Sequence, residues 1–120
     1  MQRPPKWSYD EIAIVAAVAY RAEWQYLGPA HPEVQALSRI LRSSCIHPGA
    51  CSNEMFRNPN GVARKMSDIA TQRPDYGGKP TRGGKMDIVV LEELLADPPA
   101  FLKKADLIRR GIDSSGPHAS

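Results

Sequence analysis

Hydrogen-bonding side chains recur at helical spacing between residues 58 and 71. Val62, Met66 and Ile69 repeat at the spacing of one helical face, which predicts that they are buried. At 3.6 residues per turn, the opposite face carries four polar residues and no acid: Asn60, Arg64, Ser67 and Thr71. Asn and Arg are the side chains that pair with adenine and guanine edges in the major groove of DNA. By itself, the stripe is more typical of a solvated helix surface than of a nucleic-acid contact.

The positive charge of the chain is concentrated around this stripe. The 120 residues carry a formal charge of +3, but residues 57–85 hold seven basic side chains against two acidic ones. The seven are Arg57, Arg64, Lys65, Arg73, Lys79, Arg82 and Lys85. Because Lys and Arg displace counterions condensed on a phosphate backbone, this segregation predicts a nucleic-acid surface.

Residues 73–85 form a loop too rich in Gly and Pro for regular structure beyond a short hairpin or wing. Glycines stand beside cations in it, a composition suited to following phosphates, and Tyr76 is placed to stack on a base or sugar. The alternative interpretation is a flexible connector.

Four side chains have the types of a zinc site: His31, Cys45, His47 and Cys51. The spacing Cys-x-His-x3-Cys differs from that of common zinc sites, in which paired ligands lie about two to four residues apart. A variable loop with incidental cysteines is the favoured interpretation, and this zinc set remains the alternative. We expect no cofactor.

No motif predicts catalysis. The sequence lacks the dinucleotide, P-loop, zinc-protease and serine-hydrolase signatures, and its three histidines do not form an HNH pattern. We therefore expect no catalytic residue and no enzyme on this chain. It also lacks a run of eighteen apolar residues and a signal-peptide core, so we expect a cytoplasmic protein associated with the nucleoid.

Periodicity and capping predict an all-α fold, a compact bundle of about five short helices. The first helix follows a capping box, Ser8-Tyr9-Asp10-Glu11, and is expected to end near Leu27. Its apolar residues surround most of the cylinder, which favours the centre of the bundle over a dimer contact. The other helices are expected at about residues 32–42, 59–71, 86–96 and 100–110.

Finer details of these helices are also predicted. Ile88, Leu91 and Leu95 are in register to form the buried face of the fourth helix, and Gly111 is expected to end the fifth in a left-handed cap. The domain organisation is then a flexible segment 1–6, a single helical domain 7–112 and a disordered tail 113–120.

Several motifs resemble a known family. They are Trp7-Ser8-x-Asp10-Glu11, Leu37-Ser38 with Leu41-Arg42, Phe56-Arg57-Asn58-Pro59-Asn60-Gly61-Val62, Arg73-Pro74-Asp75-Tyr76 and Ala105-Asp106-x-Ile108-Arg109. In this order they resemble the N-terminal helical domain of HNH-type restriction endonucleases of the McrA-like, modification-dependent group, over about residues 7–110. A looser similarity is to Myb-like helix-turn-helix modules, which place an arginine-bearing third helix in the groove.

The resemblance implies a DNA-recognition module whose nuclease is a separate domain or partner. It implies contacts by Arg57, Asn58, Asn60 and Lys65, although helix capping also explains Asn58. Charge and helical spacing add the remaining predicted contacts: Arg64, Ser67, Arg73, Tyr76, Lys79, Arg82 and Lys85. The leading hypothesis is a reader of double-stranded DNA, methylated or otherwise modified, that uses helix 58–71 and clamps phosphates with loop 73–85. The alternative is an adaptor that dimerises or docks through the apolar first helix.

Overall fold

The structure is a computed structural model that describes residues 6–43, 56–78 and 84–114. These residues form an all-helical bundle without a strand in the described ranges, which confirms the predicted fold class. The helices are α1 (Tyr9–Arg21), α2 (Pro32–Ser43), α3 (Pro59–Ala70), α4 (Lys85–Ala96) and α5 (Pro98–Ser114).

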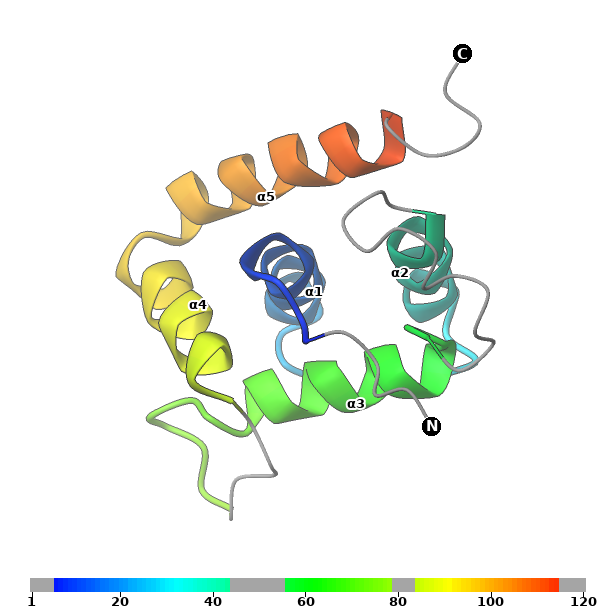
Figure 1. The fold of residues 1–120 in the computed structure, drawn as a ribbon. Helices are drawn as coiled ribbons and strands as arrows, with labels where there is room; N and C mark the ends of the chain where they lie inside the picture. The colour runs from blue at the N-terminus through cyan, green and yellow to red at the C-terminus, as the bar shows by residue number, and fades with distance from the viewer. Residues whose placement is uncertain (1–5, 44–55, 79–83, 115–120) are drawn as a thin grey trace.

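Helix α1 is the centre of the bundle, and the other four helices surround it (Figure 1). Nine consecutive residues, Glu11 to Ala19, are buried. The predicted capping box is present: the Glu11 amide donates to Ser8 Oγ at 3.2 Å, and the Ser8 amide donates to Glu11 Oε1 at 3.0 Å. The central position of this helix is therefore confirmed, and its apolar side chains are not available for docking.

Helix α1 ends six residues earlier than predicted. The amides of Glu23 and Trp24 donate to the carbonyls of Tyr20 and Ala19, which is the hydrogen-bond pattern of a Schellman cap. Glu23 and Trp24 have positive φ angles of 57° and 64°. Because glycine usually occupies such a cap, the sequence offered no signal for this ending.

Helices α2 and α3 begin and end close to the predicted residues. Asn58 caps α3 through a hydrogen bond from the Gly61 amide to its Oδ1 at 2.8 Å, and Pro59 is the first helical residue. The predicted inward residues Val62, Met66 and Ile69 are buried. Residues 44–58 join the two helices, a connection much longer than the turn of about three to four residues in a helix-turn-helix.

The predicted buried face of α4 is rotated from the observed one. Leu91 is buried, but Ile88 and Leu95 are 41% and 39% exposed, whereas Val90 and Leu94 are buried. The helix is apolar on most of its circumference, so periodicity alone could not select the face that packs against α1.

Helix α5 is longer than predicted at both ends. Asp97 caps its first turn by accepting a hydrogen bond from the Ala100 amide at 3.3 Å. Gly111 does not end the helix, because the buried side chain of Ile112 extends the packing by another turn. The helix continues to Ser114, and residues 115–120 of the predicted tail lie outside the described residues.

Candidate functional site

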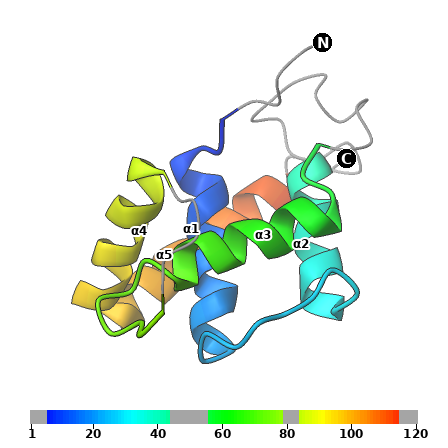
Figure 2. The ribbon, with the colours of Figure 1, turned by 90° about the horizontal axis from the view of Figure 1, so that it is seen from below.

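The outer face of α3 presents the polar stripe that the sequence predicts. Asn60 and Arg64 are exposed one helical turn apart, and Ser67 is half-buried on the same face. Thr71 is buried, and its hydroxyl donates to the Ser67 carbonyl at 2.9 Å. The available stripe therefore consists of Asn60, Arg64 and Ser67, on a helix that lies along the lower edge of the bundle in Figure 1 and crosses its near side in Figure 2.

The connection between α1 and α2 forms a wall beside this stripe. Its early Schellman turn brings Tyr26, whose side chain is 71% exposed, to the surface that Asn60, Arg64 and Ser67 line. Tyr26 was not among the predicted site residues, because the first helix was expected to continue to Leu27. Its place beside α3 depends on where α1 ends.

Two adjoining hollows form a groove along α3, which we call the α3 groove. The first hollow lies between Tyr26 and Pro29 on one side and Asn60, Arg64 and Ser67 on the other. The second lies at the C-terminal end of α3 and has a volume of about 310 Å³. Trp24, Tyr26, Ser67, Thr71, Arg73 and Tyr76 are among the residues that line it. Tyr26 and Ser67 line both hollows, so the two hollows adjoin each other.

Arg73 is held in place at the second hollow. Its Nε donates to the Ala70 carbonyl at 2.8 Å, so it caps the C-terminal end of α3. Its guanidinium carbon lies 5.1 Å from the centre of a Trp24 ring and 5.9 Å from that of Tyr76, within the range of cation–π contact. Asp75 approaches it at 3.9 Å but is 80% exposed, so this ion pair is screened by solvent. The arginine thus presents positive charge between two aromatic rings.

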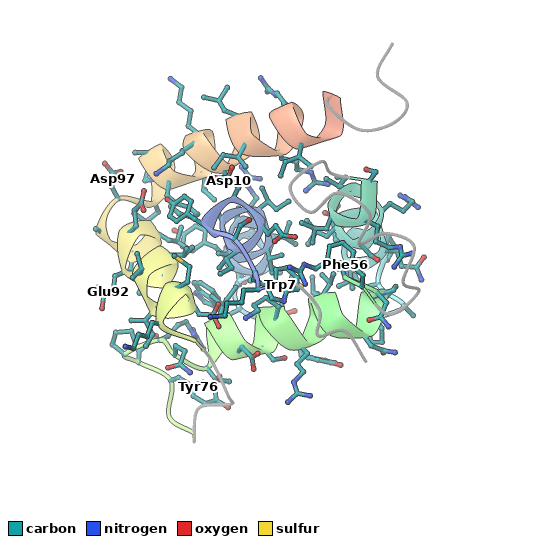
Figure 3. All side chains as sticks on the ribbon, viewed as in Figure 1. Trp7, Asp10, Phe56, Tyr76, Glu92 and Asp97 are labelled. Atoms are coloured by element: carbon teal, nitrogen blue, oxygen red, sulfur yellow. The ribbon has the colours of Figure 1, made fainter. Side chains whose placement is uncertain are left out.

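Arg57 is not on this surface. Its side chain is 3% exposed, and its Nε and one terminal nitrogen donate to the two carboxylate oxygens of buried Glu11 at 2.8 and 3.1 Å. The guanidinium carbon stacks 4.2 Å from the centre of a Trp7 ring and 4.5 Å from that of Phe56. Figure 3 shows Trp7 between α1 and α3. Arg57 therefore joins helices within the bundle, and burial excludes it from the predicted DNA contacts.

The backbone around Arg57 is held from α2. Ser38 Oγ donates to the Arg57 carbonyl at 2.7 Å, and an Arg42 terminal nitrogen donates to the Phe56 carbonyl. Arg57 itself has a φ of 47°, a left-handed conformation that costs free energy in a residue other than glycine. Residues from three of the five sequence motifs therefore meet here in one structural network: Trp7, Glu11, Ser38, Arg42 and Arg57.

Two further predicted contacts have structural partners. Lys65 Nζ donates to both carboxylate oxygens of Asp87 at 3.2 and 3.1 Å, and Asp87 also accepts from the Gly84 amide at the start of α4. The Asn58 side chain caps α3, as the alternative interpretation predicted. Both residues are positioned by the bundle rather than free to approach a ligand.

The structure places three of the remaining cations. Of the seven basic residues in 57–85, Arg57 and Lys65 are paired with acids from other segments, which leaves five. Arg64 and Lys85 are exposed and Arg73 is half-buried, whereas Lys79 and Arg82 lie outside the described residues.

Three polar side chains join α1, α4 and α5 in a second network. Lys104 Nζ on α5 donates to Tyr9 Oη and Glu93 Oε1, each at 2.7 Å, and Tyr9 Oη donates to Glu93 Oε2 at 2.6 Å. The hydrogen bond from Lys104, followed by that from Tyr9, lowers the pKa of Glu93, and partial burial raises the pKa of Tyr9. Helix α5 lies across the bundle from α3 (Figure 1), so this network is remote from the α3 groove.

The predicted zinc residues are not brought together in the part of the chain that the structure describes. Cys45, His47 and Cys51 lie outside that part, and His31 is exposed, with its Nδ1 accepting from the Glu33 amide at 3.1 Å. Within the described ranges, no cluster of three or more His, Cys, Asp or Glu side chains could hold a metal ion. The same ranges contain no helix long and apolar enough to cross a membrane.

Comparisons of the chain with protein-family models, with curated proteins and with solved structures found no match.

Proposed function

We propose that the protein binds double-stranded DNA through the outer face of α3 and the adjoining groove. The observation that carries the proposal is the pair Asn60 and Arg64, exposed one turn apart on an edge helix whose C-terminal end presents Arg73. Asn and Arg can pair with base edges in a major groove, and the surrounding cations can contact phosphates. DNA is favoured over duplex RNA because the deep, narrow major groove of RNA does not admit a helix.

The role that fits this surface is recognition without cutting. A target or modified-base reader of a restriction or defence system would use α3 in this way, with the nuclease supplied by a separate domain or partner. Loop 73–85 would contact the phosphates next to α3, through Arg73 and Lys85 in the described part and through Lys79 and Arg82 in the sequence between them.

The test is the salt dependence of binding to a labelled 20-base-pair duplex, unmodified and cytosine-methylated, measured by fluorescence anisotropy. Five neutralised phosphates predict a slope of log K against log salt of about −4 to −5. Arg64→Ala should weaken binding and, if Arg64 contacts a phosphate, reduce the slope by about 1. The matched control is Arg110→Ala, since Arg110 is also exposed but belongs to α5 on the opposite edge.

Two results would refute the proposal. One is binding that does not change with salt, and the other is an equal effect of the Arg64 and Arg110 substitutions. A higher affinity for the methylated duplex would further indicate that the protein recognises modified DNA.

The alternative function is docking to another protein. The sequence predicted α1 as the docking helix, but the exposed apolar side chains are on α4. The apolar residues of α1 are buried, but Met86, Ile88, Val89 and Leu95 of α4 are 39–52% exposed. Failure to bind any duplex, together with self-association that Val89→Glu abolishes, would favour this second function.

A further inference from the structure

The second hollow of the α3 groove has features that are not needed to recognise base pairs in a duplex. It lies beyond the stripe, and two aromatic side chains from separate segments, Tyr26 and Tyr76, are both in its lining. Tyr26 is 71% exposed and Tyr76 37%, so both rings leave apolar surface in contact with water. Figure 3 shows Tyr76 beyond the end of α3 that faces α4.

The chain supports both rings in these positions. Consecutive left-handed residues, Glu23 and Trp24, turn the backbone so that Tyr26 comes beside α3. On the other side, a Cβ on Gly78 would lie 3.0 Å from the Tyr76 ring, so the glycine leaves the space that this ring occupies. The left-handed pair Glu23 and Trp24 costs backbone free energy that an extended connector would not require.

The chemistry of the lining suits a planar heteroaromatic ring attached to an anion. Aromatic side chains stack on any nucleobase, because every base has a π-face. Arg73 places a guanidinium, with donors for a base edge or a phosphate, between the Trp24 and Tyr76 rings. The volume of about 310 Å³ is at the lower end of the range for small-ligand sites, which suits a single base rather than a base pair.

We infer that this hollow receives one nucleobase that has left the stack of the bound DNA, with Tyr26 as a stacking platform and Arg73 at the base edge or its phosphate. The inference rests on the proposed function, since α3 must first hold the duplex. From Asn60 to Thr71 the helix rises about 16 Å, which corresponds to about five base pairs along the duplex. The unstacked base would therefore lie within about five base pairs of the Asn60 contact.

The test compares two labelled 20-base-pair duplexes that differ only in a central T·T mismatch. A mismatched base leaves the stack at a lower cost, so a protein that holds an unstacked base binds this duplex more tightly. Since the T·T mismatch removes most of the cost of breaking a base pair, we expect the mismatched duplex to bind about tenfold more tightly. Tyr26→Ala should remove this preference, whereas Tyr26→Phe should retain it because the ring remains.

The control for a general loss of apolar surface is Leu107→Ala, a similarly exposed side chain on α5. Tyr26 is exposed, so its substitution should leave the melting temperature unchanged, which circular dichroism would check.

The other outcomes distinguish failure of the base-binding inference from failure of the proposed function. Equal, salt-dependent binding of both duplexes would overturn the base-binding inference and leave the proposed function intact. A mismatch preference that survives Tyr26→Ala would also overturn it, since duplex flexibility would then be the cause. Binding of neither duplex would refute the proposed function itself.

Discussion

Replacing Arg57 should destabilise the fold strongly, because its partner Glu11 is completely buried. The Arg57 side chain donates two hydrogen bonds to the Glu11 carboxylate, donates to the Lys6 carbonyl at 3.3 Å, and stacks on Trp7 and Phe56. Arg57→Ala leaves a carboxylate without its cation in a site with no exposure to water.

The size of the effect follows from this geometry. Removal of one partner from a buried ion pair typically costs about 3–5 kcal/mol. For a domain of this length, that corresponds to a decrease in melting temperature of roughly 10–20 °C. Arg57→Lys should recover only part of the loss, since an ammonium group cannot reproduce the paired hydrogen bonds or the flat stack of a guanidinium.

The assay is urea and thermal denaturation followed by circular dichroism. The double variant Glu11→Gln with Arg57→Ala should be more stable than Arg57→Ala alone, because no charge is then left buried. A loss below about 1 kcal/mol for Arg57→Ala would refute the reasoning and would return Arg57 to the exposed contacts that the sequence predicted.

Two smaller predictions concern the other helices. Gly111→Ala should stabilise the protein by about 0.5–1 kcal/mol in urea denaturation. Gly111 is an exposed helical residue, and an added Cβ would have no neighbour within 4 Å. Destabilisation would instead support the left-handed cap that the sequence predicted. The pKa of Glu93 is lowered in the folded state, so its contribution to stability is present above the ordinary carboxyl pKa of 4.5 and is lost as the pH falls through the lower folded value. Glu93→Gln should therefore reduce the melting temperature slightly at pH 7 and not at pH 2, and an equal decrease at both values would exclude the ion pair with Lys104 as the cause.

The family-like string from Phe56 to Val62 shows how far a motif can be interpreted without a structure. Its residue types suggested DNA contacts, yet Arg57 pairs with Glu11, Asn58 caps α3 and Val62 enters the core. Within this string, Asn60 is exposed on the candidate surface. The same residues that are suited to a phosphate or a base are suited to a buried ion pair and a helix cap, and sequence alone cannot distinguish these uses.

Local physical chemistry made most of the fold predictable. The capping box at Ser8, the Asn58-Pro59 start of α3 and the apolar spacing of α2 and α3 act within one or two helical turns, so they are visible in the sequence. The polar stripe of Asn60, Arg64 and Ser67 followed from the same periodicity.

The tertiary structure decided what depends on distant neighbours. The end of α1 at a turn without glycine, the face of α4 that packs inward and the passage of α5 through Gly111 each depend on burial against other helices. The α3 groove also depends on residues that are distant in the sequence. Tyr26 and Tyr76 are 50 positions apart, and they come together only when α1 ends at Arg21. Helix caps and periodicity are short-range properties of the chain, whereas burial and the pairing of Arg57 with Glu11 are long-range, and this difference in range separates what the sequence determined from what only the fold decided.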